Sequence, residues 1–259
     1  MSFKNPKREI MQLTVLGAGT CLPVAEHSAS GYLIRVNDTP LLFDAGPGTL
    51  ARLNAADVSY RDLEYVFITH LHSDHTLDLV TLLQALAATP GWTREKTLHI
   101  TGCRGLDDFL RALMQTYNGI APRGYELIVS EIVEERREFP SWTIESALTG
   151  HTQNSIAYRV ETNGRTLVYS GDASVNGNLV RLACDADVFV CECSLPEGWV
   201  KKDHLTARQV GRIAYAARVK KLVLTHLYPP ALEADVVAQV RTEFAGVIIQ
   251  ARDGLLLEI

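Results

Sequence analysis

The sequence predicts an α/β (α+β) fold in which two β-sheets pack face to face and helices cover their outer faces. Two observations support this prediction. Strand hairpins come first in each half of the chain, and alternating strands and helices follow them. Candidate metal-binding side chains stand at the C-terminal ends of strands in both halves. The sheets should therefore bring these side chains together along one edge.

The first half of the chain begins with three short apolar runs typical of strands, and Asn37-Asp38 supplies the turn between the last two. Helical spacing of apolar residues then alternates with further strands, and Pro90-Gly91 ends the first long helix. The predicted elements are strands at 12–17, 31–36 and 40–44, a helix ending near Leu53, a strand at 63–68, a helix at 77–88, a strand at 97–100 and a helix at 106–117.

The second half repeats this order. Asn163-Gly164 is a strong hairpin signal between two strands. Thr206 followed by Gln209 fits a capping box, so a helix should begin after Thr206. The predicted elements are strands at 155–161, 165–170 and 187–191, a helix ending near Arg218, a strand at 221–225, and a closing hairpin of strands at 247–250 and 254–257.

Composition limits the class of protein. The 259 residues are 47% apolar, which is enough for a sizeable core, and we expect one domain over 1–259 with residues 1–10 as a flexible lead-in and Met11 as an alternative start. A net charge of −5 argues against binding to nucleic acid through bulk charge. We find no run apolar enough to span a membrane. Five cysteines, an odd number without a C-x-x-C pattern, favour a reducing, cytoplasmic setting.

The run Thr69-His70-Leu71-His72-Ser73-Asp74-His75 is the most informative stretch of the chain. It places four potential metal ligands within six residues, directly after a predicted strand. Imidazole and carboxylate groups suit zinc and related divalent ions. Ionisable groups crowded together are unfavourable unless a cation lies among them. The run therefore predicts a metal site, and its ligand density suggests two metals.

Other potential ligands are spread along the chain. His151 stands beside a glycine at a predicted turn, while Asp172 and His226 each end a strand. Two closely spaced ions need a shared anionic ligand, and Asp172 is the natural candidate. Water between two such ions is acidified and becomes a hydroxide nucleophile near neutral pH.

This ordered set of residues resembles the metallo-β-lactamase superfamily, whose His-x-His-x-Asp-His motif is followed by a distant His, Asp and His. The resemblance extends from Leu16-Gly17-Ala18-Gly19-Thr20 through Leu42-Phe43-Asp44-Ala45-Gly46 to Thr225-His226. It implies a four-layer αββα sandwich and two divalent ions, with Zn²⁺ favoured and Mn²⁺ or Fe²⁺ as alternatives. One ion would be held by His70, His72 and His151, the other by Asp74, His75 and His226, with Asp172 between them.

Particular positions distinguish branches of this superfamily. His72 stands where di-iron oxygen-reducing members carry Glu, Asp172 where zinc β-lactamases usually carry Cys, and Val175 where acyl-homoserine lactonases carry Tyr. By contrast, His204-Leu205-Thr206 with Leu224-Thr225-His226 resembles the ribonuclease Z and phosphodiesterase branch. These departures and this likeness favour the phosphodiesterase branch.

The resemblance assigns catalytic roles to Asp74 and to His204, which would protonate the leaving oxygen. His204 lies near a helix N-terminus, whose dipole disfavours the imidazolium. A nearby carboxylate, Glu192 or Asp203, is therefore expected to raise its pKa.

Two departures separate this chain from a typical ribonuclease Z. One short hairpin joins His151 to Asp172, where that family inserts a tRNA-binding arm, and Leu227-Tyr228-Pro229-Pro230 replaces its Ser-x-Arg-Tyr-like segment. We therefore expect a hydrolase of small or nucleotide-like phosphodiesters, with nucleic acid not favoured as a substrate. The alternatives are a thioester or lactone hydrolase, a ribonuclease Z-type tRNA 3′-end endonuclease, and a non-catalytic metal-dependent binding protein. Relatives in this branch often form dimers, which makes a homodimer a further expectation.

Weaker signals concern single residues. Asp44 could accept a hydrogen bond from a metal-bound imidazole, or it could be an ordinary turn residue. Thr69 and Ser73 are expected to satisfy loop backbone, and His27 and His99 are not expected to bind metal. Cys191 and Cys193 should face the same side as core residues.

Overall fold

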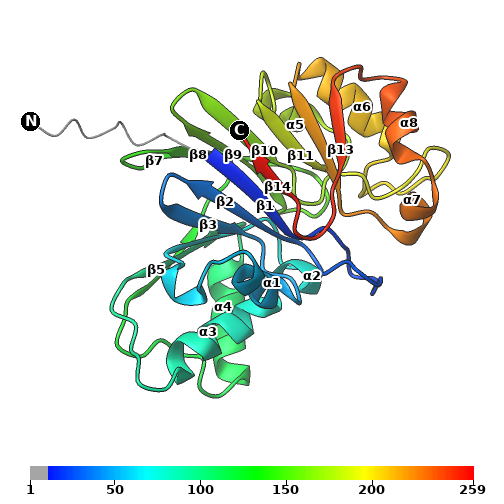
Figure 1. Ribbon diagram of the computed structural model, residues 1–259. Helices are drawn as coiled ribbons and strands as arrows, with labels where there is room; N and C mark the ends of the chain where they lie inside the picture. Colours follow the sequence, from blue (N-terminus) through cyan, green and yellow to red (C-terminus); the bar gives the residue numbers. More distant parts are fainter. Residues whose placement is uncertain (1–10) are drawn as a thin grey trace, which may run out of the picture.

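The computed structural model describes residues 11–259 and has the expected four-layer arrangement, with two sheets packed face to face and helices outside them (Figure 1). The lead-in predicted at 1–10 lies outside the described residues. In the described part of the chain each sheet has seven strands.

The strands of the first sheet follow the spatial order β14 (Leu256–Glu258), β1 (Met11–Gly17), β2 (Gly31–Val36), β3 (Thr39–Phe43), β4 (Tyr65–Ile68), β5 (Leu98–Gly102) and β6 (Leu127–Glu131). Those of the second follow β13 (Val247–Gln250), β12 (Lys221–Thr225), β11 (Val188–Glu192), β10 (Arg165–Tyr169), β9 (Ile156–Thr162), β8 (Thr143–Leu148) and β7 (Arg136–Glu138). Each sheet is antiparallel at one side and parallel at the other.

Helices cover the two outer faces (Figure 1). Those next to the first sheet are α1 (Thr49–Ala55), α2 (Ser73–Thr76), α3 (Asp78–Ala88) and α4 (Leu106–Thr116), with the short 3₁₀ helix η1 (Tyr60–Asp62). Those next to the second sheet are α5 (Gly177–Leu182), α6 (Ala207–Ala216), α7 (Pro229–Glu233) and α8 (Val236–Arg241). Both members of the predicted capping box, Thr206 and Gln209, form their hydrogen bonds at the start of α6.

Three apolar clusters separate the layers, because the central strands bury both faces. Along β11, Val188 and Val190 face the cluster between the sheets, whereas Phe189 and Cys191 face the cluster beneath α5, α6 and α8. A strand that is buried on both faces has a continuous run of apolar residues in its sequence. Cys191 and Cys193 lie in the same outer cluster, which confirms their predicted core role.

This topology places the C-terminal ends of several strands from both sheets along one shared edge of the molecule. The chain leaves β3, β4, β8, β10 and β12 at this edge, and the segments that follow carry Asp44, His70, His151, Asp172 and His226 respectively. Parallel strands end at the same edge of their sheet, which is where open α/β sheets place their ligand sites. The expectation that the candidate ligands share one edge is confirmed.

One prediction about the fold was wrong. The closing segments at 247–250 and 254–257 do not form a hairpin, because β13 pairs in parallel with β12 and β14 pairs antiparallel with β1 in the other sheet. Alternating apolar residues reveal a strand but not its partner. The connection passes through Ala251, which is buried among the side chains between the sheets.

Several elements were not predicted. They are β6, β7, β8, η1, α2, α5, α7 and α8. The β7 strand is only three residues long, is charged, and lies at a sheet edge, and α5, α7 and α8 have five or six residues each. Such short elements carry too few periods of apolar residues to be recognised.

Candidate metal centre

The first group of clustered side chains contains three imidazoles. His70 Nε2 lies 3.0 Å from His72 Nδ1, and His72 Nδ1 lies 3.2 Å from His151 Nε2. His70 and His72 follow β4, while His151 follows β8 in the other sheet. Residues far apart in the sequence thus place three ring nitrogens at one point.

The tautomers of two of these rings are fixed by neighbours. The Thr69 hydroxyl donates to Asp44, so its oxygen accepts from Nδ1 of His70 at 3.1 Å. Nδ1 of His151 donates to the backbone carbonyl of Asp203 at 2.7 Å. In its neutral form each of these two rings presents an Nε2 lone pair to the centre, and His72 can donate to only one of them. Convergent lone pairs of this kind are stabilised by a cation.

The second group contains Asp74, His75 and His226. The Asp74 Oδ2 atom lies 3.6 Å from His75 Nε2 and 3.4 Å from His226 Nε2. The donor atoms of this group all lie within 4.8 Å of one another, as do those of His70, His72, His151 and Asp172. Both groups have the size and composition of a divalent-metal site.

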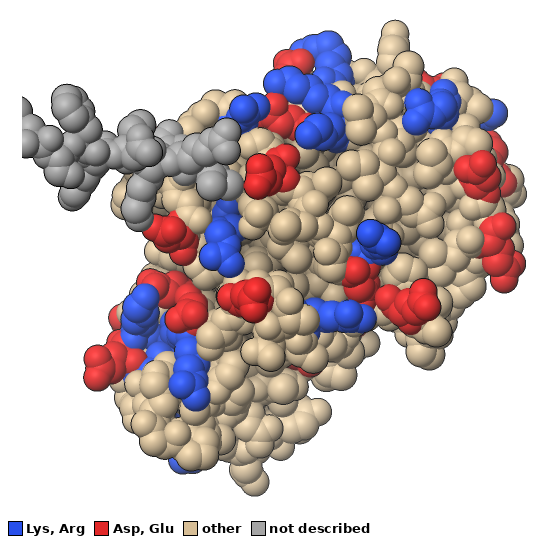
Figure 2. Space-filling view, in the orientation of Figure 1, with Lys and Arg blue, Asp and Glu red and all other residues tan. Residues whose placement is uncertain are grey.

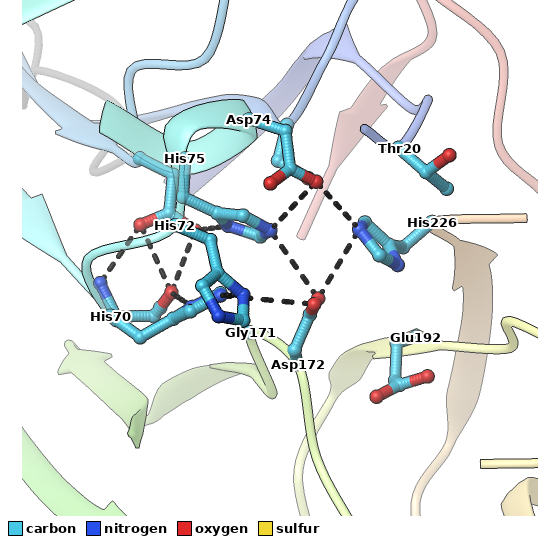
Figure 3. Close-up of polar contacts among 12 residues, drawn as sticks. Thr20, His70, His72, Asp74, His75, Gly171, Asp172, Glu192 and His226 are labelled. Atoms are coloured by element: carbon cyan, nitrogen blue, oxygen red, sulfur yellow. Dashed lines mark hydrogen bonds and ion pairs between the residues drawn. The ribbon is translucent and has the colours of Figure 1, made fainter. Parts of the chain in front are cut away.

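Asp172 lies between the two groups (Figure 3). Each of its oxygens faces one group. Oδ2 is 3.8 Å from His70 Nε2 and 3.6 Å from His151 Nε2. Oδ1 is 3.4 Å from Nε2 of both His75 and His226. This is the arrangement expected of a carboxylate shared by two ions.

Two tests indicate that the donor set fits metal ions. Among the described residues, His75 Nε2 and Asp172 Oδ1 are buried without a hydrogen-bond partner. Such atoms need a partner of another kind, because an unsatisfied buried polar group is unfavourable. The second test is the donor set itself. Two carboxylates and five imidazoles with one open side suit borderline divalent ions.

The pKa values follow from this crowding. Burial and the nearby His75 lower the pKa of His70 well below its usual value. Burial alone would also lower the pKa of His75, but the charges of Asp172 and Asp44 raise it well above the ordinary range. Burial would raise the pKa of Asp172, yet His226 and His75 hold it well below normal. The charges of Asp172 and Asp44 therefore favour the protonated form of His75, and a metal ion would compete with that proton.

Asp44 orients the ligands from behind. Its Oδ2 lies 2.7 Å from Nδ1 of His75, and Tyr169 donates its hydroxyl to the same oxygen at 2.7 Å. Thr69 donates both its backbone N–H and its hydroxyl. Of the two interpretations of Asp44, the structure supports the hydrogen bond to a candidate ligand. Thr69 does more than satisfy loop backbone, since it also holds His70.

Gly171 allows Asp172 to reach this position. It has a φ of +54°, and a Cβ added there would lie 2.7 Å from the Cβ of Thr69. Only glycine combines this backbone conformation with such a close approach. The turn after β10 therefore depends on Gly171, and it packs directly against the segment that carries His70.

Comparison with known proteins identifies the family. A family model described as the metallo-beta-lactamase superfamily matches residues 25–226. The chain belongs to the metallo-beta-lactamase superfamily. An uncharacterized protein of Mycobacterium leprae is 32% identical over 265 residues, covering 96% of this chain and 89% of that protein. A ribonuclease Z of Archaeoglobus fulgidus is 24% identical over 273 residues, covering 84% and 87% respectively.

Solved structures agree with this assignment. The crystal structure of YhfI, a metallo-beta-lactamase fold protein from Bacillus subtilis, has a TM-score of 0.85 and 26% identity, and the match covers 97% of this chain and 100% of YhfI. The αββα prediction is confirmed. As a member of this superfamily, the chain is a hydrolase of the metallo-beta-lactamase fold with a potential metal site.

His204 lies beside the two groups of candidate metal ligands, and its ring is held by Glu192. Nδ1 of His204 is 3.2 Å from both oxygens of the Glu192 carboxylate, which also accepts hydrogen bonds from the backbone of Ala173 and Leu205 and from the Ser194 hydroxyl. Burial would lower the pKa of His204, but the hydrogen bond and charge of Glu192 raise it above its usual value. Of the two carboxylates considered from the sequence, Glu192 makes this contact, whereas Asp203 contributes its backbone carbonyl to His151.

A pocket of about 350 Å³ opens over the clustered donors. Its lining residues are Cys21, His72, Ser73, Asp74, His151, Asp172, Lys201, Asp203, His204 and Tyr228. Sequence reasoning did not assign a role in the site to Cys21 or Tyr228, nor to Ser194 behind it. Tyr228 follows the predicted ligand His226 by two residues, and that proximity was the available signal.

The two remaining histidines lie outside both groups, as predicted. His27 Nδ1 is 3.7 Å from Asp253, and the ring of His99 stacks on Tyr65 with 5.1 Å between centroids.

Within residues 11–259, no helix has the length and apolar character needed to cross a membrane.

Proposed function

We propose that this protein is a binuclear metal-dependent phosphodiesterase that acts on small or nucleotide-like phosphodiesters. The observation that carries the proposal is the position of His204. Its ring lines the same pocket as the candidate metal ligands, and one of its nitrogens lies within 4.8 Å of ligand atoms of Asp172 and His226. A proton donor thus stands beside the centre that would bind phosphate.

The proposed roles of the ligands follow their grouping. His70, His72 and His151 would hold one ion, Asp74, His75 and His226 the other, and Asp172 both. Two ions, with Zn²⁺ favoured by this donor set and Mn²⁺ or Fe²⁺ as alternatives, would supply Lewis acidity and acidify a water molecule. Asp74 is proposed as a catalytic residue because its carboxylate lines the open pocket as well as facing the second group.

His204 would supply the proton for the leaving group. Its Nδ1 is engaged by Glu192, so Nε2 is the nitrogen available to the pocket. The raised pKa keeps this ring protonated closer to neutral pH. An alkoxide expelled from a phosphodiester is strongly basic and needs such a proton, whereas a thiolate expelled from a thioester needs it much less. His204 therefore favours phosphodiesters over the thioester alternative.

The dimensions of the pocket favour a small substrate. A volume of about 350 Å³ lies near the lower end of the range for small-molecule sites. Between His151 and Asp172 the described chain consists of β9 and β10, joined by the Asn163-Gly164 turn. The face in Figure 2 mixes acidic and basic side chains with broad uncharged areas. The relative named ribonuclease Z supports the phosphodiester class, while these features favour a smaller ester than tRNA.

The leaving group provides the test of this proposal. We expect His204→Ala to reduce kcat about 10²–10⁴-fold on a phosphodiester with an alkoxide leaving group. The loss should be much smaller on bis(4-nitrophenyl) phosphate, because nitrophenolate leaves without a proton. Equal losses on both substrates would exclude His204 as the proton donor.

A substrate panel separates the alternatives. Wild-type protein loaded with metal would be compared on phosphodiesters, a thioester, a lactone and a tRNA precursor. Preference for either carbonyl ester, or for tRNA, would replace the proposal with that alternative. Two bound ions without turnover of any ester would indicate a binding protein.

A further inference from the structure

One wall of the pocket carries a positively charged side chain that the chemistry described so far does not use. Among the lining residues that the structure describes, Lys201 alone is a lysine or arginine. It lies in the segment between β11 and α6 that also leads to His204. Its neighbour Lys202 is exposed and does not line the pocket.

The Lys201 ammonium is held at the pocket by two contacts. Its Nζ lies 5.2 Å from the centroid of the Tyr228 ring, within the range of a cation–π interaction. It also lies 3.9 Å from Oδ2 of Asp203. The side chains of Lys201 and Asp203 are 43% and 45% exposed, so their ion pair is weak. An incoming anion can therefore compete with Asp203 for the ammonium.

Tyr228 gives the lysine a fixed support. Its ring meets the His204 ring edge-on at 5.5 Å and the His226 ring at 5.6 Å. Its backbone N–H donates to the carbonyl of Ser194 at 3.2 Å, immediately before α7 begins. The ring is thus packed between the proposed proton donor and a candidate metal ligand, and it presents one face to Lys201.

We propose that Lys201, supported by the Tyr228 ring, binds an anionic group of the substrate and makes the pocket selective for anionic over neutral esters. This inference rests on the proposed function and narrows its substrate class. A phosphodiester carries a negative charge whatever its leaving group is. The compact ammonium of a lysine binds phosphate oxygens well. A neutral lactone or thioester gains nothing from the same charge. Lys201 would act as a specificity-determining residue rather than as part of the chemistry.

The test compares two substrates that share a leaving group but differ in charge. Bis(4-nitrophenyl) phosphate is anionic, and 4-nitrophenyl acetate is neutral. We expect Lys201→Ala to lower kcat/KM for the phosphate about tenfold or more, since hydrogen bonds to charged groups are among the stronger ones. The acetate should be unaffected, and Lys201→Arg should restore most of the difference. Lys202→Ala is the matched control, with the same loss of charge one residue away.

Variants at two neighbouring positions test the geometry. Asp203→Asn removes the competing carboxylate but keeps the backbone carbonyl that His151 uses, so the KM for the phosphate should fall. Tyr228→Phe keeps the ring face and should keep the preference for the phosphate over the acetate, whereas Tyr228→Leu should lose that preference as Lys201→Ala does. Raising the salt concentration should reduce the difference between wild type and Lys201→Ala, because the attraction is screened.

The outcomes separate this inference from the proposed function. If the wild type hydrolyses no phosphodiester, the proposed function fails. If it does, but Lys201→Ala and Lys202→Ala have the same kcat/KM for the phosphate, the role of Lys201 is wrong. Equal losses by Lys201→Ala on phosphate and acetate would also overturn it, because they would indicate a general effect on the site.

Discussion

The carboxylate of Glu192 lies 3.2 Å from Nδ1 of His204, and it connects that residue to the metal-binding groups. The same carboxylate accepts a hydrogen bond from Ser194, whose oxygen lies 3.2 Å from Nδ1 of His226. One buried acid therefore orients both the proposed proton donor and a candidate ligand. Asp44 plays a comparable part on the other side of the centre, where it contacts His75 and Thr69.

Glu192→Gln should shift the pH dependence of phosphodiester hydrolysis. His204 acts as an acid in its protonated form, so turnover of alkoxide-leaving substrates should fall as pH rises through its pKa. Glu192 raises that pKa, and burial opposes it. Removing the charge should therefore move the alkaline limb of the kcat profile to lower pH, measured with metal in excess. An unchanged limb would mean that His204 does not determine it.

Asp44→Asn should weaken metal binding without removing a candidate ligand. The substitution removes the charge that His75 and Thr69 share, and loss of such an outer partner typically lowers metal affinity about 10–100-fold. Competition with a fluorescent chelator would measure the change. Tyr169→Phe, which removes only one of the donors to Asp44, should have a smaller effect. If both variants bind metal as tightly as the wild type, Asp44 does not tune the site.

Gly171→Ala should destabilise the fold more than Gly164→Ala. Both glycines have positive φ, +54° and +72°, but an added Cβ meets Thr69 at Gly171 and nothing within 4 Å at Gly164. The shared backbone strain should cost about 1–2 kcal/mol at each position, and the clash at Gly171 should add about 1–3 kcal/mol more. Chemical denaturation of the two variants gives the difference. Similar losses in the free energy of unfolding would show that the turn after β10 can move to accommodate an added Cβ.

Much of the fold could be predicted from the sequence because its long apolar runs and its turn residues agree. The capping box at Thr206 and the Asn163-Gly164 turn appear where they were expected. The partner of β13 could not be predicted, since the residues that choose β12 over β14 lie far away in the sequence. The short edge strand β7 carries no apolar signal at all.

The candidate site was predictable to the extent that its donors are rare residue types at strand ends. The grouping of His151 with His70 and His72 needed the resemblance before the structure showed the distances. The shared position of Asp172 was expected because two close ions need an anionic ligand between them. Asp44 and Glu192 were only two among several carboxylates that could have served. Ser194 and Cys21 carry no local signal, because their place in the site depends on how the loops of both sheets meet. Tyr228 had only its closeness to His226 in the sequence as a signal.

The metal content of the purified protein tests the two-metal centre most directly. After exchange into metal-free buffer, elemental analysis would be made on the wild type and on the Asp172→Ala variant, each reloaded with Zn²⁺. Two ions per wild-type chain are predicted, with a clear loss in the variant, because Asp172 has one oxygen facing each group of donors. Retention of fewer than two ions by the wild type, or an equal content in the two proteins, would contradict a centre bridged by Asp172.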